Sequence, residues 1–540
     1  MVRGNGLRIT CRLLAACLVL VFSGARGLRA GDELPAGALG SVSFEISCKP
    51  EVRADFDRGV RLLHSFWYEA AADAFARVVA ADPGCAMGYW GEAMTHFPQI
   101  NGWPQPAGLV AAQGALAAAD AASERTPREA AYVHALHLFY DGYTPREARE
   151  HARLYCDAMG ALSQANPDDL EAQVFYALAL LASDPPDDVT LVNPHKAYAI
   201  LGPLFQAHPD HPGIAHYLIH ACDNPQMALD GLAAAQRYAT IAPAAPHALH
   251  MPSHIFARLG LWPEDIRSNL ASRAAAEDPA GMHMGAENRL HAMEFLEYAY
   301  LQIGHDEEAQ AIVAEAAAVT PAEVDARYPD YYATVEARFP ALYAIETHDW
   351  TMAAKLTPIA GGDAYSQALT LLAHVTAAGH RHDARAAQQA RRALAGLLRK
   401  EPPPPLGTLG LTAPAEIRAW ATFANGDLTG AVALLRPVAD RQAKMGKGEV
   451  EPPAREMLAE MLLLGGHTAA ALREYQTSLR SDPNRFNALL GAAQAAEQLG
   501  QRSLAAEYYV TLVHNCPGAT GAARRFLEHA AAVAAAQPRN

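Results

Sequence analysis

The chain has 540 residues, of which 51% are apolar and 19% are charged, and its formal net charge at pH 7 is −15. A single hydrophobic core rarely serves so long a chain, so we expect several units or an extended repeat array. The acidic balance argues against nucleic-acid binding, which depends on the neutralisation of phosphates by lysine and arginine.

The first 30 residues resemble an export signal. Arginines precede an apolar run over 13–22, and small residues follow it. The run has about half the length that a membrane-spanning helix needs, and the cysteine of a lipobox-like "LAAC" at 14–17 lies inside it. We therefore expect cleavage after Ala25 or Ala30. This favours a soluble periplasmic or secreted protein over a lipoprotein or an inserted membrane protein.

Five cysteines would remain after cleavage: Cys48, Cys85, Cys156, Cys222 and Cys516. None of them forms a CxxC pair, which argues against a thiolate zinc site and against a thioredoxin-like redox motif. In an oxidising compartment, Cys48 and Cys85 could pair and tie the N-terminal segment to the first helical hairpin. The alternative is that both are free buried thiols.

Alanine-rich, amphipathic helical periodicity runs along the chain, without a convincing alternating strand. A pattern of about 34 residues recurs, in which Gly59, Leu62, Ala71, Phe75 and Pro83 correspond to Ala459, Leu462, Ala471, Tyr475 and Pro483. Small residues let two helices cross closely, the aromatic residue fills the gap, and the proline ends the second helix. On these residues the chain resembles the tetratricopeptide-repeat (TPR) superfamily over most of 52–520. The resemblance implies an all-α, right-handed solenoid of helical hairpins whose first helices line a concave groove.

The proline run "EPPPPLG" at 401–407 is the clearest break in the helical pattern, because four prolines cannot continue a helix. The sequence therefore predicts four segments: a signal peptide over 1–30, an N-terminal TPR-like array over 31–360, a helical connector over 361–415 that contains the linker 401–407, and a C-terminal TPR array over 416–535.

Histidines concentrate on three consecutive segments that we expect to be first helices of their hairpins. The segments are "HPGIAHYLIHACDNP" with His216, His220 and Asp223, "HALHMPSHIF" with His247, His250 and His254, and "GAENRLHAMEFLEYAYLQIG" with Glu287, His291 and Glu294. The pair His216 and His220 recurs as His250 and His254 one repeat of about 34 residues later. Pro252 either kinks the second helix or starts it, in which case His247 and His250 lie on the approach to it.

Equivalent positions of neighbouring repeats lie side by side in a solenoid, so these histidines should share one groove. We predict a metal site of six ligands: His216, His220, His247, His250, His254 and His291. One allocation places the first three around one ion and the last three around another. Imidazole ligands favour copper or iron over calcium or magnesium, and two such ions would suit a metal-dependent oxidoreductase. A single zinc ion with Glu287 or Glu294 as general base is the hydrolytic alternative, although no HExxH motif is present.

Four further residues are weaker candidates for the metal site: His64, His96, His211 and Asp223. His211 could instead cap the start of its helix, and Asp223 could end it. His64 belongs to the first repeat, so it could approach the cluster only if the solenoid curls tightly. His96 precedes a proline-containing loop that could form a lid or an end cap.

The stretches "LLHSFWY", "DPGCAMGYWGEAMTH", "HPGIAHYLIH" and "HALHMPSHIF" are similar to a group of exported, histidine-bearing bacterial TPR proteins. Where such proteins often carry a histidine-proline pair before a tryptophan, this chain has "FPQINGW", which puts a ligating role for that loop in doubt. The TPR resemblance itself implies a groove for a small molecule, a peptide or a partner protein. An interaction scaffold, or a metal carrier without catalysis, therefore stands as the alternative to an oxidoreductase.

Overall fold

The computed structural model describes residues 37–123, 125–185, 188–277, 286–324, 331–359, 362, 364–400, 412–447 and 450–535, apart from the side chains of Asn101 and Lys400. The predicted signal peptide and the linker 401–407 lie outside these ranges. Within them the chain is helical and contains no β-strand, which confirms the all-α prediction.

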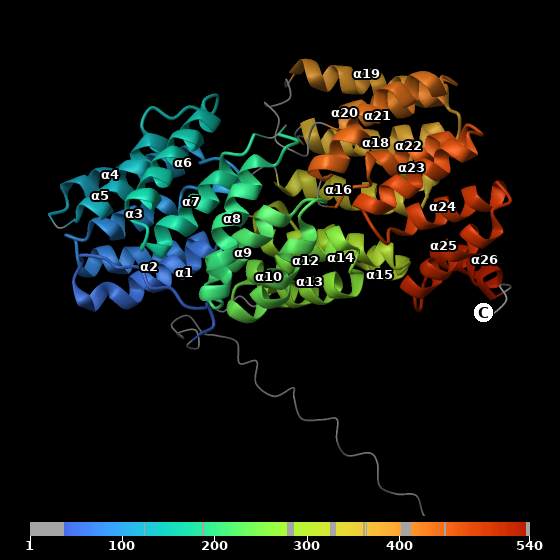
Figure 1. Ribbon diagram of the computed structural model, residues 1–540. Coiled ribbons are helices and arrows are strands. Elements are labelled where there is room, and N and C mark those ends of the chain that lie inside the picture. The colour runs from blue at the N-terminus through green and yellow to red at the C-terminus, as the bar shows by residue number, and fades with distance from the viewer. Residues whose placement is uncertain are drawn as a thin grey trace, which may run out of the picture.

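The first half of the chain is a series of helical hairpins in which each helix packs against the next (Figure 1). Three short 3-10 helices accompany them, at Pro50–Val52, Gln99–Asn101 and Pro321–Glu323. The hairpins are α1 (Arg53–His64) with α2 (Tyr68–Ala81), α3 (Ala86–Met94) with α4 (Pro106–Ala121), α5 (Pro127–Tyr140) with α6 (Ala148–Ala165), α7 (Leu170–Ala182) with α8 (Val192–Ala207), α9 (Pro212–Cys222) with α10 (Ala228–Ile241), α11 (Pro246–His250) and α12 (Pro252–Leu259) with α13 (Trp262–Glu277), and α14 (Glu287–Gln302) with α15 (Asp306–Ala316).

The second half continues in the same way, so the fold is a solenoid of TPR-like hairpins. The part of the chain predicted as a helical connector also supplies a hairpin, α18 with α19. The helices of this half are α16 (Tyr331–Glu346) with α17 (Trp350–Ala353), α18 (Ala364–His380) with α19 (Ala384–Lys400), α20 (Ala413–Ala424) with α21 (Leu428–Met445), α22 (Ala454–Leu464) with α23 (Thr468–Ser481), α24 (Phe486–Gln498) with α25 (Arg502–Asn515), and α26 (Ala523–Ala535).

Glycines opposite aromatic rings allow the helices to pack this closely. A Cβ placed on Gly59 or on Gly91 would lie only 2.7 Å or 2.2 Å from the Phe75 ring, which fills the space between α1 and α3. The same contact recurs near the C-terminus, where a Cβ on Gly491 would lie 2.2 Å from the Tyr475 ring. These are contacts that no larger residue could make without a shift of the helix, so the repeat pattern seen in the sequence has a steric origin.

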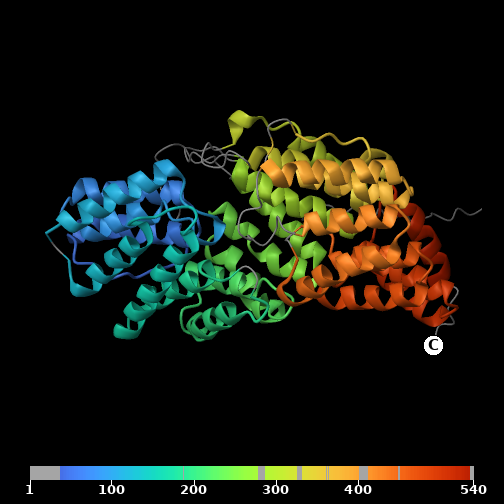
Figure 2. The same ribbon diagram turned by 90° about the horizontal axis from the view of Figure 1, so that it is seen from above.

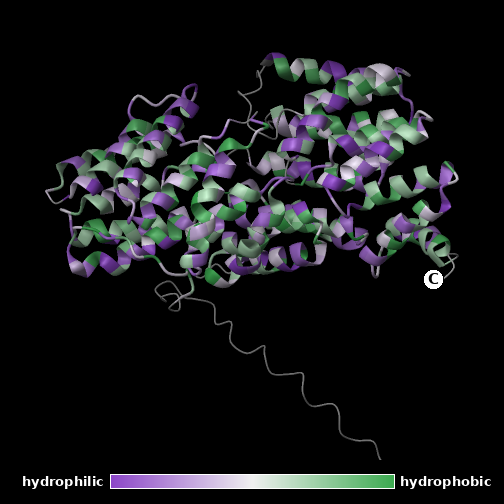
Figure 3. Cartoon of the chain, in the orientation of Figure 1, coloured by the Kyte–Doolittle hydropathy of each residue, from purple (hydrophilic) through white to green (hydrophobic). Residues whose placement is uncertain are grey.

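Hydrophilic and hydrophobic residues are intermingled along the helices (Figure 3). Within the described ranges, no helix combines the length and apolarity that crossing a bilayer requires.

The solenoid closes on itself, because its last hairpins contact the hairpins in the middle of the chain (Figures 1 and 2). Gly260, which ends α12 with a positive φ of 64°, lies so close to the Pro483 carbonyl that a Cβ there would be 2.3 Å from the oxygen. Trp262 donates its indole N–H to the Asn484 carbonyl at 2.9 Å. Further along, the Thr520 amide donates to the Gly304 carbonyl at 2.9 Å.

A fully buried arginine lies at the centre of this contact. Arg485, just before α24, donates to Glu456 of α22 at 2.8 Å and to Glu346 of α16 at 2.7 Å. It also donates to the Tyr298 hydroxyl of α14 at 2.5 Å. One guanidinium thus joins four segments that are far apart in sequence.

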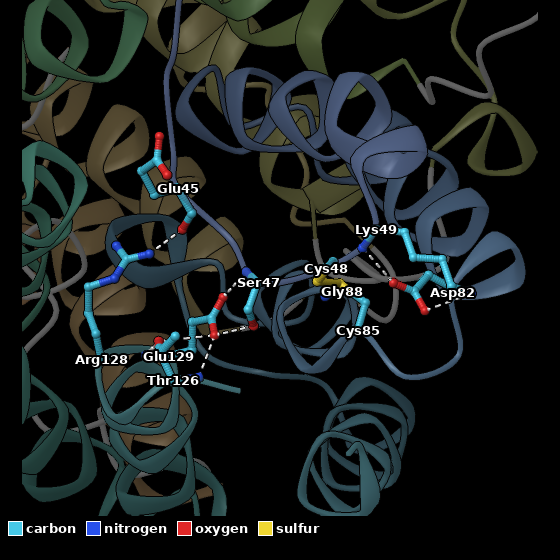
Figure 4. The surroundings of a disulfide bond; sticks show 10 residues. All are labelled: Glu45, Ser47, Cys48, Lys49, Asp82, Cys85, Gly88, Thr126, Arg128 and Glu129. Carbon is cyan, nitrogen blue, oxygen red and sulfur yellow. Dashed lines mark hydrogen bonds and ion pairs between the residues drawn. A yellow bond between two sulfur atoms is a disulfide. The ribbon is translucent and has the colours of Figure 1, made fainter. Parts of the chain in front are cut away.

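The N-terminal segment is attached to the first hairpins by a disulfide between Cys48 and Cys85, as the sequence had suggested as one possibility (Figure 4). On either side of it, Ser47 donates to Glu129 at 2.6 Å and the Lys49 amide donates to Asp82 at 2.9 Å. Phe44, 1% exposed, packs edge-on against the rings of other buried aromatic residues, among them Trp90. The segment therefore contributes to the core of the first repeats.

Replacing Arg485 by methionine should lower the free energy of unfolding by about 3–5 kcal/mol, because it leaves two buried carboxylates without their cation. Urea unfolding followed by circular dichroism measures this. Arg480→Met is the matched control, since Arg480 is exposed on α23 and its loss should change stability by less than about 0.5 kcal/mol. Equal unfolding midpoints for the two variants would contradict the role assigned to Arg485.

The double variant Cys48→Ser, Cys85→Ser should lose about 2–4 kcal/mol of stability, because the disulfide joins residues 37 positions apart and restricts the unfolded chain. Peptide mapping without reduction should first show the two cysteines linked. The same urea titration on the oxidised parent and the variant then gives the difference, and coincident curves would show that the bond contributes nothing.

Candidate metal centre

The first helices of three successive hairpins, α9, α11–α12 and α14, carry two groups of three histidines that could each hold a metal ion. The first triad is His216, His220 and His247, and the second triad is His250, His254 and His291; within each triad the ligand atoms lie within 4.8 Å of one another. The structure thus brings together all six histidines that the sequence singled out, in the allocation predicted for two ions.

Pro252 starts α12, while His247 and His250 lie on the short helix α11 just before it. Met251 joins the two helices in a helical conformation (φ −50°, ψ −34°), so the backbone bends without unwinding. The bend divides this segment between the triads. His247 belongs to the first triad, while His250 and His254 belong to the second.

The spacing of the ligand nitrogens matches a metal site. His216 Nε2 lies 3.1 Å from His220 Nε2 and 3.2 Å from His247 Nε2. In the second triad, His250 Nε2 and His254 Nε2 are 3.0 Å apart. A tetrahedral ion with nitrogen ligands at about 2.0–2.1 Å has ligands about 3.3 Å apart, so little movement would be needed to accommodate one.

The opposite nitrogens of four of these rings are held by hydrogen bonds that fix the protonation of each ring. His216 Nδ1 donates to the backbone carbonyl of His64 at 2.6 Å, and His254 Nδ1 donates to Asp223 at 2.9 Å. His250 Nδ1 donates to Asn269 Oδ1 at 2.6 Å. The fourth, His291 Nδ1, donates to Glu294 at 3.2 Å.

Each of these acceptors is itself held in place. Asn269 donates its amide to Asp265 at 2.7 Å, so its oxygen must face His250. Arg258 pairs with Asp223 at 2.8 Å. Ring orientation of metal-binding histidines is usually set by such outer hydrogen bonds.

In the second triad, Nδ1 of His250 and of His254 each donates to an acceptor outside the triad, while their Nε2 atoms lie 3.0 Å apart. In the neutral form of both rings, the two Nε2 atoms would be lone-pair acceptors that face each other. Two lone pairs at this distance repel each other unless a cation lies between them.

Burial keeps four of the six imidazoles neutral. Burial, and after it the neighbouring imidazoles, lower the pKa of His216, His247 and His250 well below the usual value for histidine. The same causes, with His254 as the largest contributor among the imidazoles, lower the pKa of His220 to about 3. Neutral imidazole is the form that binds metals, so no proton has to be displaced from these rings at neutral pH.

The two triads are adjacent. Ring centroids are 6.0 Å apart between His247 and His250, and 6.1 Å apart between His220 and His254. An aromatic ring covers each triad: Phe66 lies 4.4 Å from the His216 ring, and Phe295 lies 4.7 Å from the His250 ring. His220, His247 and His291 remain half-buried, which leaves access from solvent.

Two glycines permit the helices around the site to approach closely. A Cβ on Gly213, at the start of α9, would lie 2.4 Å from His64 Nδ1. A Cβ on Gly231 of α10 would lie 2.7 Å from Cys222 of α9 and 2.9 Å from Ile255 of α12. Both spaces can be filled only by hydrogen.

The weaker candidates lie beside the triads rather than in them. His64 and His211 form a separate buried group with Glu171, whose oxygens lie 2.8 Å and 2.9 Å from the two rings. His211 Nδ1 also accepts from the Ile214 amide, so it caps α9 as the alternative interpretation held. The solenoid curls enough for α1 to contact α9, which brings the His64 carbonyl to His216.

The candidate carboxylates and His96 lie outside the two triads. Asp223 and Glu294 each hold the Nδ1 side of a triad histidine. Burial raises the pKa of Glu294, but Arg338 at 2.8 Å outweighs it and the pKa is lowered, which makes this carboxylate a weak proton acceptor. Glu287 begins α14. His96 lies against Gly108 of α4, and neither residue belongs to a triad.

No protein-family model matches the sequence, and no curated protein sequence matches it. Among solved structures, the chain is similar to an IFIT1 monomeric mutant with Gppp-AAAA, with 11% identity, a TM-score of 0.36, and coverage of 92% of this chain and 99% of that one. The APC/C hetero-tetramer Cut9-Hcn1 gives 12% identity, a TM-score of 0.32, and coverage of 89% and 96%. The P58(IPK) TPR domain gives 13% identity, a TM-score of 0.20, and coverage of 89% and 98%. Likeness at this level gives no guide to function, so the site is interpreted from its own geometry.

The variant Asn269→Ala should bind metal at the second triad about 10–100-fold more weakly, because His250 loses the hydrogen bond that orients its ring. Competition with a chromophoric chelator measures the affinity. Asn166→Ala is the control, since Asn166 makes only a local hydrogen bond to Leu162 at the end of α6. Unchanged affinity in Asn269→Ala, with the fold intact, would show that this hydrogen bond does not support the ligand.

Proposed function

We propose that the protein holds two transition-metal ions, one in each triad, with copper or iron favoured over zinc, and that it acts as a metal-dependent oxidoreductase. The observation that carries the proposal is the pair His250 Nε2 and His254 Nε2, which lie 3.0 Å apart while Nδ1 of each ring donates to an acceptor on its other side. A cation there would convert a repulsion into two bonds.

The donor set supports the choice of metal. Both triads offer only imidazole nitrogens, which suit copper, iron and zinc but not magnesium or calcium. Three protein ligands leave a coordination position open for a further molecule, as in catalytic rather than structural sites. A pair of such ions, when bound, supplies redox chemistry with dioxygen as the oxidant.

The protein's own residues have three tasks in this proposal. The outer hydrogen bonds of His216, His250 and His254 hold the ligands in one orientation before metal arrives, which lowers the cost of binding. Phe66 and Phe295 cover the triads and limit the access of water. The half-buried histidines leave an entrance for a substrate.

The disulfide supports export of the protein to the periplasm or the medium. A bond between Cys48 and Cys85 persists in an oxidising compartment and is rare in the reducing cytosol. We therefore propose that the protein is exported to the periplasm or the medium, as the leader-like N-terminus predicts.

Metal carriage without catalysis is the second candidate. It is favoured by the exposure of His291, whose side chain is 29% accessible and could pass an ion to another molecule. Both functions need the same ligands, so they differ in whether the bound ions react.

Metal analysis of the purified protein should find one ion per triad, and substitution of either triad should remove one of them. The variants are His216→Ala with His247→Ala for the first triad, and His250→Ala with His254→Ala for the second. Each should lose about half of the bound copper or iron, because the other triad keeps its three ligands. Elemental analysis by mass spectrometry gives the count.

The control exchanges two exposed histidines outside the triads, His134→Ala with His195→Ala, and should keep the full metal content. Electron paramagnetic resonance then tests whether the ions form a pair. Two adjacent Cu(II) ions should couple and give much less signal than the copper content, whereas each triad variant should show the full signal of one ion. Full signal from the parent would contradict a paired oxidative centre and leave carriage, and absence of any bound metal would refute both.

A further inference from the structure

A second site lies in the C-terminal half, away from the histidine triads. The first helices α16, α18, α20, α22 and α24 surround a cavity of about 240 Å³, which we name the C-terminal cavity. These helices occupy the same place in their hairpins as the helices that carry the triads. The cavity is therefore part of the concave side of the solenoid, where this repeat architecture exposes an extended surface.

The charge of the cavity is negative. Three carboxylates line it, Glu346, Glu456 and Glu460, and the described residues around it include no lysine or arginine. Arg485, behind the lining, pairs with Glu346 and Glu456 and compensates one of the three charges. Glu460 carries one of the two that remain.

In the part of the chain that the structure describes, the basic groups within 4.0 Å of Glu460 are two imidazoles. His380 Nε2 lies 3.1 Å and His348 Nε2 lies 3.7 Å from its carboxylate. Burial lowers the pKa of His348, so that ring is neutral at neutral pH. Burial raises the pKa of Glu460, but the two histidines outweigh it and lower the pKa, so the carboxylate stays ionised. Glu460 is half-buried, and a carboxylate that faces a cavity is stabilised by a cation that enters it.

A buried donor also lacks its partner at this cavity. The indole of Trp420 is fully buried and lines the cavity, yet its Nε1–H makes no hydrogen bond. A buried N–H without an acceptor is uncommon in folded proteins. A simple metal or ammonium ion could not satisfy it, because neither has an acceptor atom. A peptide satisfies it with a carbonyl oxygen.

We propose that the C-terminal cavity binds an extended peptide segment through one of its basic side chains, with the cationic group at Glu460 and a peptide carbonyl at the Trp420 indole. The planar guanidinium of arginine fits best, since it can donate to a carboxylate through two N–H groups and can stack on aromatic rings. Trp350 and Trp420 flank His380 with ring centroids 3.9 Å and 5.3 Å from it, so such rings are close by. The proposal does not depend on metal at the triads.

The test uses the full-length mature protein and a pentapeptide of alanine with a central arginine, acetylated and amidated at its ends. Isothermal titration calorimetry should show binding. The same peptide with citrulline, which is neutral and similar in shape, should bind at least about tenfold more weakly, because it leaves the Glu460 charge uncompensated. Equal affinities for the two peptides, or no binding of the arginine peptide at 1 mM, would overturn the proposal.

Variants of the protein locate the binding. Glu460→Gln should weaken the arginine peptide by about tenfold or more and leave the citrulline peptide unchanged. Glu497→Gln is the matched control, because Glu497 lies on α24 but is exposed and outside the cavity. Gel filtration and circular dichroism confirm that both variants fold. If Glu460→Gln binds as tightly as the control, the site lies elsewhere and the proposal fails.

A third arm separates a peptide from a small free cation. Butylguanidinium carries the same charge but no carbonyl for Trp420, so it should bind at least about tenfold more weakly than the arginine peptide. Binding of butylguanidinium as tight as that of the peptide would show that the cavity takes free amines or guanidines, and the peptide assignment would be wrong.

Discussion

The two histidine triads can form only because the helices around them pack very closely. Two glycines, Gly213 and Gly231, permit this close packing. Gly213 lets the end of α1 reach α9, and Gly231 lets α9 and α12 pack on either side of α10. A single methyl group at either position would move a ligand helix by a substantial part of an ångström. An ion bound as proposed would tolerate little displacement of the histidines, so the steric fit of the scaffold would also decide the geometry of the site.

The sequence was sufficient to predict the solenoid and that the six histidines would gather, with the observed grouping as one allocation. The reason is that residues separated by one repeat lie side by side, so the pair His216 and His220 had to lie next to the pair His250 and His254. Periodicity of this kind is local and does not depend on the tertiary path of the chain.

The supporting residues could not be predicted in the same way. The acceptor for His216 is a backbone carbonyl, that of His64, which leaves no mark in the sequence. Asn269 lies on α13, the second helix of its hairpin, and its sequence context is like that of any polar residue there. A polar residue on a helix that packs against a histidine-bearing helix is the one feature that could have indicated its role. Phe66 and Phe295 resemble ordinary core positions. The closure at Arg485 depends on the accumulated curl of many repeats, and the sequence of any one repeat does not determine that curl.

The two halves of the protein are joined through the site itself. From His291, a chain of hydrogen bonds passes through Glu294 and Arg338 to the Tyr365 hydroxyl at 3.0 Å and on to Glu451 at 2.8 Å. The last ligand of the second triad is thus held by residues of the helices that lead into the C-terminal half.

The contact between the last hairpins and α12–α15 also bears on how such a protein can evolve. Open solenoids lengthen or shorten by duplication or loss of whole repeats, because each repeat touches only its neighbours. Here Gly260 must meet Pro483, and Trp262 must meet Asn484. One repeat more or fewer between these points would separate both pairs. The closed solenoid therefore has a fixed repeat number in this span, and its divergence must proceed by substitution.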